Sequence, residues 1–346
     1  MTASTSPRAP SEKGARKRKR MTVPLPAEGE NGLFTESWYP ICMSSELQAG
    51  QIKGVPFLDG KVVAIRGQSG EARVLSAYCP HVGSDLSIGK VIGDRVQCAF
   101  HRWEYDLDGI CVETTRKGEP PPPTACLFNF PTVERYGLIW AFNGEKPHWE
   151  LPDMPYPDED LYCRVVEGTT FMADPAHACC NTPDYHHFRT IHGLDWKHPD
   201  PDADKDMIWT DHSFRLTVEG THWNDMPMRL TVGINSTTLF VQDSVIDGKW
   251  FAYLVPLTIR KPGTAFFYNV VLTHRGDKSP AAERRAREIA DWAMKLETEL
   301  VMQDAAILNS IRFKQGTLTR TDKRLAKYLE LVRKQPRGHA SADFIK

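Results

Sequence analysis

Short runs of apolar residues recur along the first half of the chain, and turn residues separate them. The runs lie at 38–41, 55–58, 61–66, 73–76, 95–97, 127–131 and 137–142. Runs of this length, rich in branched and aromatic side chains and bounded by Gly or Asp, are typical of β-strands. The pattern predicts a small all-β domain over residues 33–146.

Five further runs predict a second sheet. They lie at 214–218, 228–234, 237–243, 250–256 and 264–272. Turn pairs such as Asp247-Gly248 separate them, which indicates antiparallel neighbours. A proline-rich stretch at 147–157 is typical of a linker. A second domain is therefore predicted over residues 147–346.

The period changes to that of a helix near the end of the sequence. Ser279-Pro280 is a typical helix start, and the helix is expected to run to about residue 313. A shorter helix is expected at 323–333. At 100° per residue, the long helix has one apolar stripe. Its members are Ile289, Ala293, Leu296, Leu300, Ile307, Leu308 and Ile311. The predicted fold class is α+β.

Length and charge limit the possibilities further. With 346 residues the chain can form two domains, and no apolar run is long enough to cross a bilayer. No signal peptide is visible, so a cytoplasmic protein without membrane contact is expected. Residues 1–20 hold seven Lys or Arg residues against Glu12, whereas the whole chain has a net charge of −1. We expect a disordered basic tail over 1–32, inert rather than bound to nucleic acid or a targeting receptor.

Two mixed pairs of cysteine and histidine carry the clearest chemical signal. They are Cys79-x-His81 and Cys98-x-x-His101. This donor set suits a [2Fe–2S] cluster in which one iron takes both sulfurs and the other takes both imidazoles. Structural zinc sites usually place two cysteines together and two histidines together, so the spacing favours the cluster. The other six of the eight cysteines are expected to be small buried residues rather than disulfides.

A second constellation lies at 181–193. A mononuclear Fe(II) that activates O2 uses two histidines and one carboxylate on one face. His187 and His192 are the candidate histidines. They are five residues apart, about 140° around a helix, so the helix must bend or end between them. Gly193 is a plausible stop.

The carboxylate is expected from the late helix. Asp304 lies within the apolar stripe, where a charge is costly unless a metal, a salt bridge or a cap pairs with it. Glu297, two turns earlier at the edge of the stripe, is the rival, and Glu299 points away. Asp184 precedes His187 by three residues and is expected to hydrogen-bond a histidine ligand and connect the two centres. His186 is expected to be solvent-facing or structural rather than a ligand.

With these motifs in place, the chain resembles the oxygenase component of Rieske non-haem iron oxygenases. The resemblance is greatest to monooxygenases without a second subunit, such as ketosteroid hydroxylases, O-demethylases and aminopyrrolnitrin N-oxygenases. It implies a Rieske β domain followed by a catalytic domain whose antiparallel sheet is covered by helices, in a homotrimer. The family often has Gly after the last cluster histidine, where this sequence has Arg102.

The resemblance also implies roles. His187, His192 and Asp304 match the iron triad, and Asp184 matches an aspartate that links one subunit's iron to its neighbour's cluster. Electrons would come from a reductase or ferredoxin, which consumes NAD(P)H, because no Gly-x-Gly-x-x-Gly motif follows a strand here.

The expected reaction uses O2 to hydroxylate, demethylate or N-oxygenate a small aromatic or polycyclic compound. The compound would lie over residues 214–272. About half of five large aromatic residues there should contact it. They are Phe240, Trp250, Phe251, Tyr253 and Phe266. One alternative is an electron-transfer protein, which has no need of the second iron. Another is a redox or metal sensor that keeps both metal sites without turnover.

Overall fold

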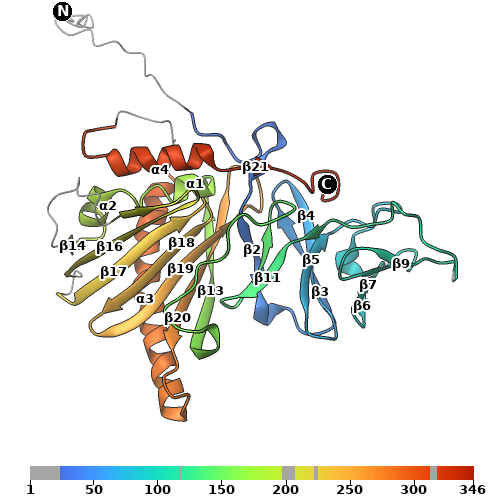
Figure 1. Ribbon diagram of the computed structural model, residues 1–346, viewed down its shortest axis with the longest axis horizontal. Coiled ribbons are helices and arrows are strands. Elements are labelled where there is room, and N and C mark those ends of the chain that lie inside the picture. Colours follow the sequence, from blue (N-terminus) through green and yellow to red (C-terminus); the bar gives the residue numbers. More distant parts are fainter. Residues whose placement is uncertain (1–23, 117, 197–206, 222–224, 312–317) are drawn as a thin grey trace, which may run out of the picture.

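Two lobes lie side by side in the protein (Figure 1). The computed structural model describes residues 24–116, 118–196, 207–221, 225–311 and 318–346. Most of the predicted tail, residues 1–23, lies outside these ranges. The last part of that tail is packed rather than disordered. Glu28 is buried, because its carboxylate accepts hydrogen bonds from the backbone and hydroxyl of Thr35 at 2.9 and 2.6 Å and lies 3.5 Å from Arg337.

The lobe on the right in Figure 1 is built from short antiparallel strands, as predicted. One sheet has the order β10 (Asn129–Phe130), β5 (Ala72–Ser76), β4 (Gly60–Arg66) and β3 (Gln51–Phe57). A second has the order β11 (Thr132–Arg135), β12 (Leu138–Phe142) and β2 (Trp38–Met43). Strand β11 was not predicted, because it is largely polar and owes its place to pairing with β12.

A third small sheet forms the outer end of this lobe. Its order is β6 (Lys90–Ile92), β7 (Arg95–Gln97), β8 (Glu104–Asp106) and β9 (Cys111–Glu113). The short helical turn η3 (Leu86–Ile88) precedes it. The two loops with the cysteine and histidine pairs leave and enter this sheet, one between β5 and β6 and the other between β7 and β8.

An eight-stranded antiparallel sheet dominates the other lobe. Its order is β13 (Leu161–Phe171), β20 (Ala265–His274), β19 (Lys249–Thr258), β18 (Leu239–Ile246), β17 (Pro227–Asn235), β16 (Ser213–Thr221) and β14 (Asp195–Trp196), with β15 (Met207–Trp209) also paired to β16. The five predicted strands are all present. Strand β13 was missed because only its two ends are buried and the stretch between them mixes apolar with polar residues without a clear alternation.

In the described part of the chain, four α-helices accompany this sheet. They are α1 (Pro175–Ala178), α2 (Tyr185–Thr190), α3 (Pro280–Leu308) and α4 (Lys323–Lys334). The predicted cap of α3 is confirmed, since Ser279 Oγ accepts a hydrogen bond from the backbone of Ala282 at 3.3 Å. The helix ends at Leu308, earlier than expected, and Ile307 is 41% exposed rather than buried. The buried face is filled largely by small alanines, which let α3 approach the sheet closely.

The two lobes share a hydrophobic core. Trp38 and Trp140 of the strand-rich lobe pack in one cluster with Leu239 and Leu254 of the large sheet. The end of the described chain also returns to the first lobe. There β21 (Arg337–Gly338) pairs with β1 (Phe34–Thr35), and further short turns are η1 (Glu30–Gly32), η2 (Ser44–Glu46) and η4 (Asp158–Asp160). No helix in the described ranges is long and apolar enough to cross a membrane.

Candidate cluster and metal sites

The two cysteine and histidine pairs meet at the outer end of the first lobe. Each loop is held by a backbone hydrogen bond, from Cys79 to Ser84 at 2.9 Å and from Cys98 to Trp103 at 2.8 Å. Both cysteine side chains face the core, and the residues are 2% and 1% exposed. The Nδ1 atoms of His81 and His101 lie 3.1 Å apart at the surface.

This donor set fits a [2Fe–2S] cluster with its sulfur side inside and its histidine side at the surface. The hydroxyl of Tyr105 lies 3.0 Å from Cys79 Sγ. Burial raises the pKa of the Cys79 thiol, so a thiolate there needs a positive partner such as iron. Trp103 stacks on His81 with ring centroids 4.4 Å apart. All eight cysteines lie within the described residues and are free. Of the six outside the cluster motif, Cys42, Cys111 and Cys179 are buried as expected, whereas Cys126, Cys163 and Cys180 are only partly buried.

The second site begins at α2. Asp184 is its N-cap, His187 lies in its last turn, and the helix ends at Thr190. Gly193 then has a φ of +63°, a backbone conformation that glycine adopts without strain. The helix therefore ends between the two histidines, as their spacing predicted.

The end of α2 brings both imidazoles to one carboxylate of α3. Asp304 Oδ1 lies 2.7 Å from His187 Nε2 and 3.3 Å from His192 Nε2. One ligand atom from each residue lies within 4.8 Å of the others. Burial alone would raise the pKa of Asp304, but hydrogen bonds to the two histidines outweigh it and hold that pKa below its usual range. Two imidazoles and one carboxylate on one side of a cavity fit a mononuclear Fe(II). Their role as its ligands stays a prediction.

Two amide side chains hold this trio in place, and the sequence had assigned a role to neither. Gln303 Oε1 lies 3.0 Å from His192 Nδ1 and accepts its proton, which leaves Nε2 free for a metal. Asn181 Nδ2 donates to the second oxygen of Asp304 at 2.7 Å. Only their positions in the sequence could have indicated them, Gln303 beside Asp304 and Asn181 at the start of the motif.

Within one chain, the hydrogen-bond partners of Asp184 differ from those expected. Its carboxylate accepts the backbone N–H groups of His186 at 2.9 Å and His187 at 3.3 Å. Groups in a helix's first turn lack a helical acceptor, so the N-cap side chain takes them. The imidazole Nδ1 of His187 is buried and has no partner among the described residues, so the expected bond from Asp184 to a ligand imidazole is absent. Its role in linking two centres stays a prediction.

A mostly apolar cavity opens beside the trio. Of the five aromatic residues expected around a substrate, only Phe240 and Tyr253 line it. The other three pack elsewhere: Trp250 against Tyr156, Phe251 against Trp292, and Phe266 against Tyr268.

The rival carboxylate, Glu297, also lines this cavity, but it lies outside the trio. Gln242 Nε2 donates to Glu297 Oε1 at 2.6 Å, and burial raises the pKa of Glu297 to about 7. Glu299, on the same helix, is exposed, as predicted.

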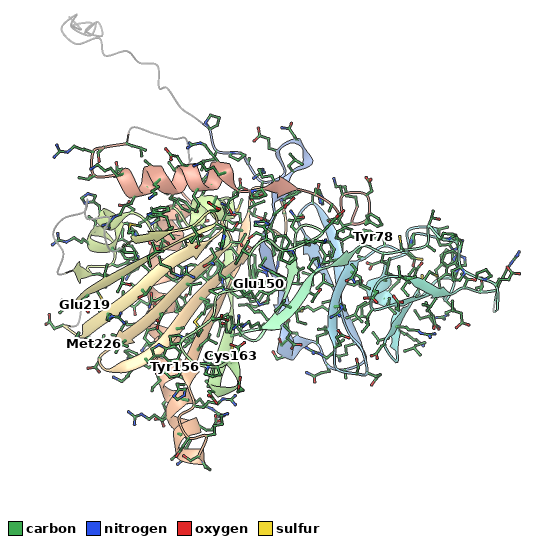
Figure 2. All side chains as sticks on the ribbon, in the orientation of Figure 1. Tyr78, Glu150, Tyr156, Cys163, Glu219 and Met226 are labelled. Atoms are coloured by element: carbon green, nitrogen blue, oxygen red, sulfur yellow. The ribbon has the colours of Figure 1, made fainter. Side chains whose placement is uncertain are left out.

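The two candidate sites lie at opposite ends of the molecule. In Figure 2, Tyr78, the neighbour of Cys79, lies in the right-hand lobe. Figure 1 shows α2, which carries His187, at the far left of the large sheet. The centres are therefore separated along the longest axis of the chain.

Comparison with known proteins supports both halves of this description. Residues 37–131 match the model of the Rieske [2Fe–2S] domain. The chain is 34% identical over 143 residues to cholesterol 7-desaturase nvd 1 of Ciona intestinalis, covering 40% of this chain and 29% of that protein. It is 34% identical over 131 residues to aminopyrrolnitrin oxygenase PrnD of Pseudomonas fluorescens, covering 36% of each. These matches span less than half the length of the curated relatives.

A solved structure extends the likeness to the second lobe. NdmA of Pseudomonas putida CBB5, solved with caffeine, superposes with a TM-score of 0.62 at 21% identity. The superposition covers 86% of this chain and 89% of NdmA. The likeness is one of fold.

Proposed function

Because this chain carries a Rieske [2Fe–2S] domain and has the fold of the Rieske oxygenases, we propose that it is the terminal oxygenase component of a Rieske non-haem iron monooxygenase. The observation that carries the proposal is the meeting of His187, His192 and Asp304 beside an apolar cavity. A pure electron carrier needs the cluster but has no use for that trio. Together the metals would supply single electrons at one centre and O2 activation at the other.

The residues of this chain have separable tasks in that reaction. Buried Cys79 and Cys98, with His81 and His101 at the surface, would hold the cluster where a ferredoxin or reductase can approach it. NAD(P)H would be consumed by that partner. The exposed apolar side chains around the loops are a surface suited to docking. They include Val82 at 58% exposed and Phe100 at 63%.

At the other centre, the side chains of this protein would hold the metal ligands in position and would not themselves react. Gln303 and Asn181 fix the orientation of His192 and Asp304, and apolar walls exclude water from the cavity. The same walls bind the organic substrate, which we propose is a small aromatic or polycyclic compound that is hydroxylated, demethylated or N-oxygenated.

Assembly and location follow from the same proposal. A homotrimer would bring the cluster end of one chain to the Asp184 end of the next, which the separation of the two centres within one chain requires. Eight free cysteines are consistent with a reducing compartment, and we propose a cytoplasmic protein.

Metal content and oxygen consumption test the function. The purified protein should hold about three irons per chain, two in the cluster and one beyond it. With a surrogate reductase, a screen of aromatic amines, aryl ethers and steroids should yield a compound consumed only in the presence of O2. Two irons per chain with no O2-dependent consumption would instead identify an electron carrier. A full iron complement without turnover would indicate a sensor.

A further inference from the structure

Two polar side chains that line the cavity form a hydrogen-bonded pair and are not members of the metal trio. Gln242 lies on β18 and Glu297 on α3, and their residues are 5% and 3% exposed. We propose that this pair is the binding subsite for a hydrogen-bond donor of the substrate, an O–H or N–H group. This inference rests on the proposed function, because it names the class of substrate that the same cavity takes.

The pair has acceptor capacity to spare. Glu297 Oε1 accepts from Gln242 Nε2 at 2.6 Å, and no other hydrogen bond to the Glu297 side chain comes from the described residues. Gln242 Nε2 also reaches Ser244 Oγ at 3.5 Å, while the amide oxygen of Gln242 receives no donor from them. A carboxyl group has two oxygens and an amide has one, so two acceptors are left beside the cavity.

No lysine or arginine of the described residues accounts for the carboxyl group, and the charged neighbour that favours its ionised form is the imidazole of His192. Among the described residues, Glu297 forms no ion pair with a lysine or an arginine. A ligand that fills the cavity removes water from these two oxygens, and a donor on the ligand would replace the hydrogen bonds that the water made. A compound of the same shape without a donor would leave the acceptors unpaired and would bind more weakly.

The position of the pair also sets the length of the substrate. Glu297 and Asp304 are seven residues apart on α3, two turns along one face and about 10 Å along the helix axis. A molecule anchored at Glu297 and reacting beside Asp304 must span roughly that distance. A rigid skeleton of two or more rings, with its donor at the end away from the reacting atom, meets the requirement.

Matched probes test this with the iron-loaded protein under anaerobic conditions. The probes are 4-hydroxybiphenyl, 4-aminobiphenyl and 4-methylbiphenyl, which have similar shapes and of which only the first two carry a donor. Calorimetric titration gives each Kd. At least one donor probe should bind about tenfold more tightly than the methyl probe, the value of one additional hydrogen bond. The hydroxyl and amine arms show which donor the subsite prefers.

Glu297→Gln tests whether Glu297 recognises the substrate or only forms a hydrogen bond that joins α3 to the sheet. The amide oxygen of this variant can still accept from Gln242, but an NH2 group replaces the free carboxyl oxygen. The preference for donor probes should therefore fall severalfold below the wild-type ratio, because the amide oxygen of Gln242 is then the one free acceptor left in the pair. Glu299→Gln, at an exposed position two residues away, is the matched control and should keep the wild-type ratio.

Equal affinities for all three probes in the wild type would overturn the inference. A preference for donor probes in Glu297→Gln that is as large as in the wild type would also overturn it. If none of the three probes bound, the inference would be overturned as well. Each readout is a binding ratio measured without O2. The result therefore stands apart from the test of the proposed function, which is O2-dependent consumption.

Discussion

Gln303 decides which nitrogen of His192 faces the metal position. Its amide oxygen accepts the Nδ1 proton at 3.0 Å, and Nε2 then points to Asp304. We predict that Gln303→Leu lowers affinity for Fe(II) by about tenfold to a hundredfold, since loss of such a bond frees the imidazole to rotate. Metal titration of the apo-protein would measure this. Met302→Leu, at the exposed neighbouring position, is the control, and equal affinities in the two variants would contradict the role.

Arg102 follows the last cluster histidine with a φ of +59°. This left-handed conformation costs an ordinary residue about 1 kcal/mol or more, and glycine nothing. The related family often has glycine at this position, and the backbone supplies the reason.

The strained backbone at Arg102 predicts that two substitutions there change the stability in opposite directions. Arg102→Gly should retain the cluster with unchanged or higher thermal stability. Arg102→Val should be less stable than the glycine variant by about 1–2 kcal/mol, because a β-branched side chain is least tolerated at positive φ. Thermal unfolding followed by the visible absorption of the cluster measures both. Equal stability of the two variants would show that the loop relaxes.

Single elements show how far sequence could predict this structure. The strands of the large sheet were predicted because their apolar residues recur between clear turns. Strand β13 was not, since it is stabilised by pairing with β20 rather than by its own pattern. Asp304 was predicted because a charge interrupts an apolar stripe, whereas Gln303 is an exposed residue on the same helix with no such contrast. The pairing of Gln242 with Glu297 depends on how α3 lies on the sheet, and no local pattern encodes that.

The segment after α4 is held on the first lobe by ion pairs with one carboxylate and by a buried side chain. His339 Nε2 and Lys346 Nζ each lie 2.8 Å from a carboxylate oxygen of Asp59, and Ile345 is fully buried in the core of the first lobe. Burial alone would raise the pKa of Asp59, but hydrogen bonds from Lys346 and His339 outweigh it and lower that pKa.

A lowered carboxyl pKa in the folded state stabilises the protein above the unfolded value of about 3.9, and the contribution is lost as pH falls through the folded value. We therefore predict that the wild type loses more stability than Asp59→Asn between about pH 5 and pH 3. Denaturant unfolding at several pH values gives the comparison. Parallel pH profiles would show that the carboxylate contributes nothing to docking of this segment.

The separation of the two centres makes Asp184 a test of the assembly. Asn caps a helix as well as Asp does, so Asp184→Asn should keep α2 and both metal sites. If the carboxylate connects a neighbour's cluster to this chain's iron, the variant should slow reoxidation of the reduced cluster about tenfold or more. Stopped-flow absorption after mixing with O2 and a substrate measures that rate. An unchanged rate with full iron content would remove Asp184 from the path.

Co-assembly of two inactive variants tests the path directly. Cys79→Ser should lack the cluster, and His187→Ala should lack the mononuclear iron, so a trimer of either alone has no turnover. In one chain the two candidate sites lie at opposite ends of the long axis (Figure 1), so in the proposed trimer the cluster of one chain would serve the iron of a neighbour. We predict that co-expression of the two variants restores O2-dependent turnover, because mixed assemblies of the proposed kind would place an intact cluster against an intact iron site. A mixture that holds both kinds of centre yet stays inactive would show that electrons travel within one chain.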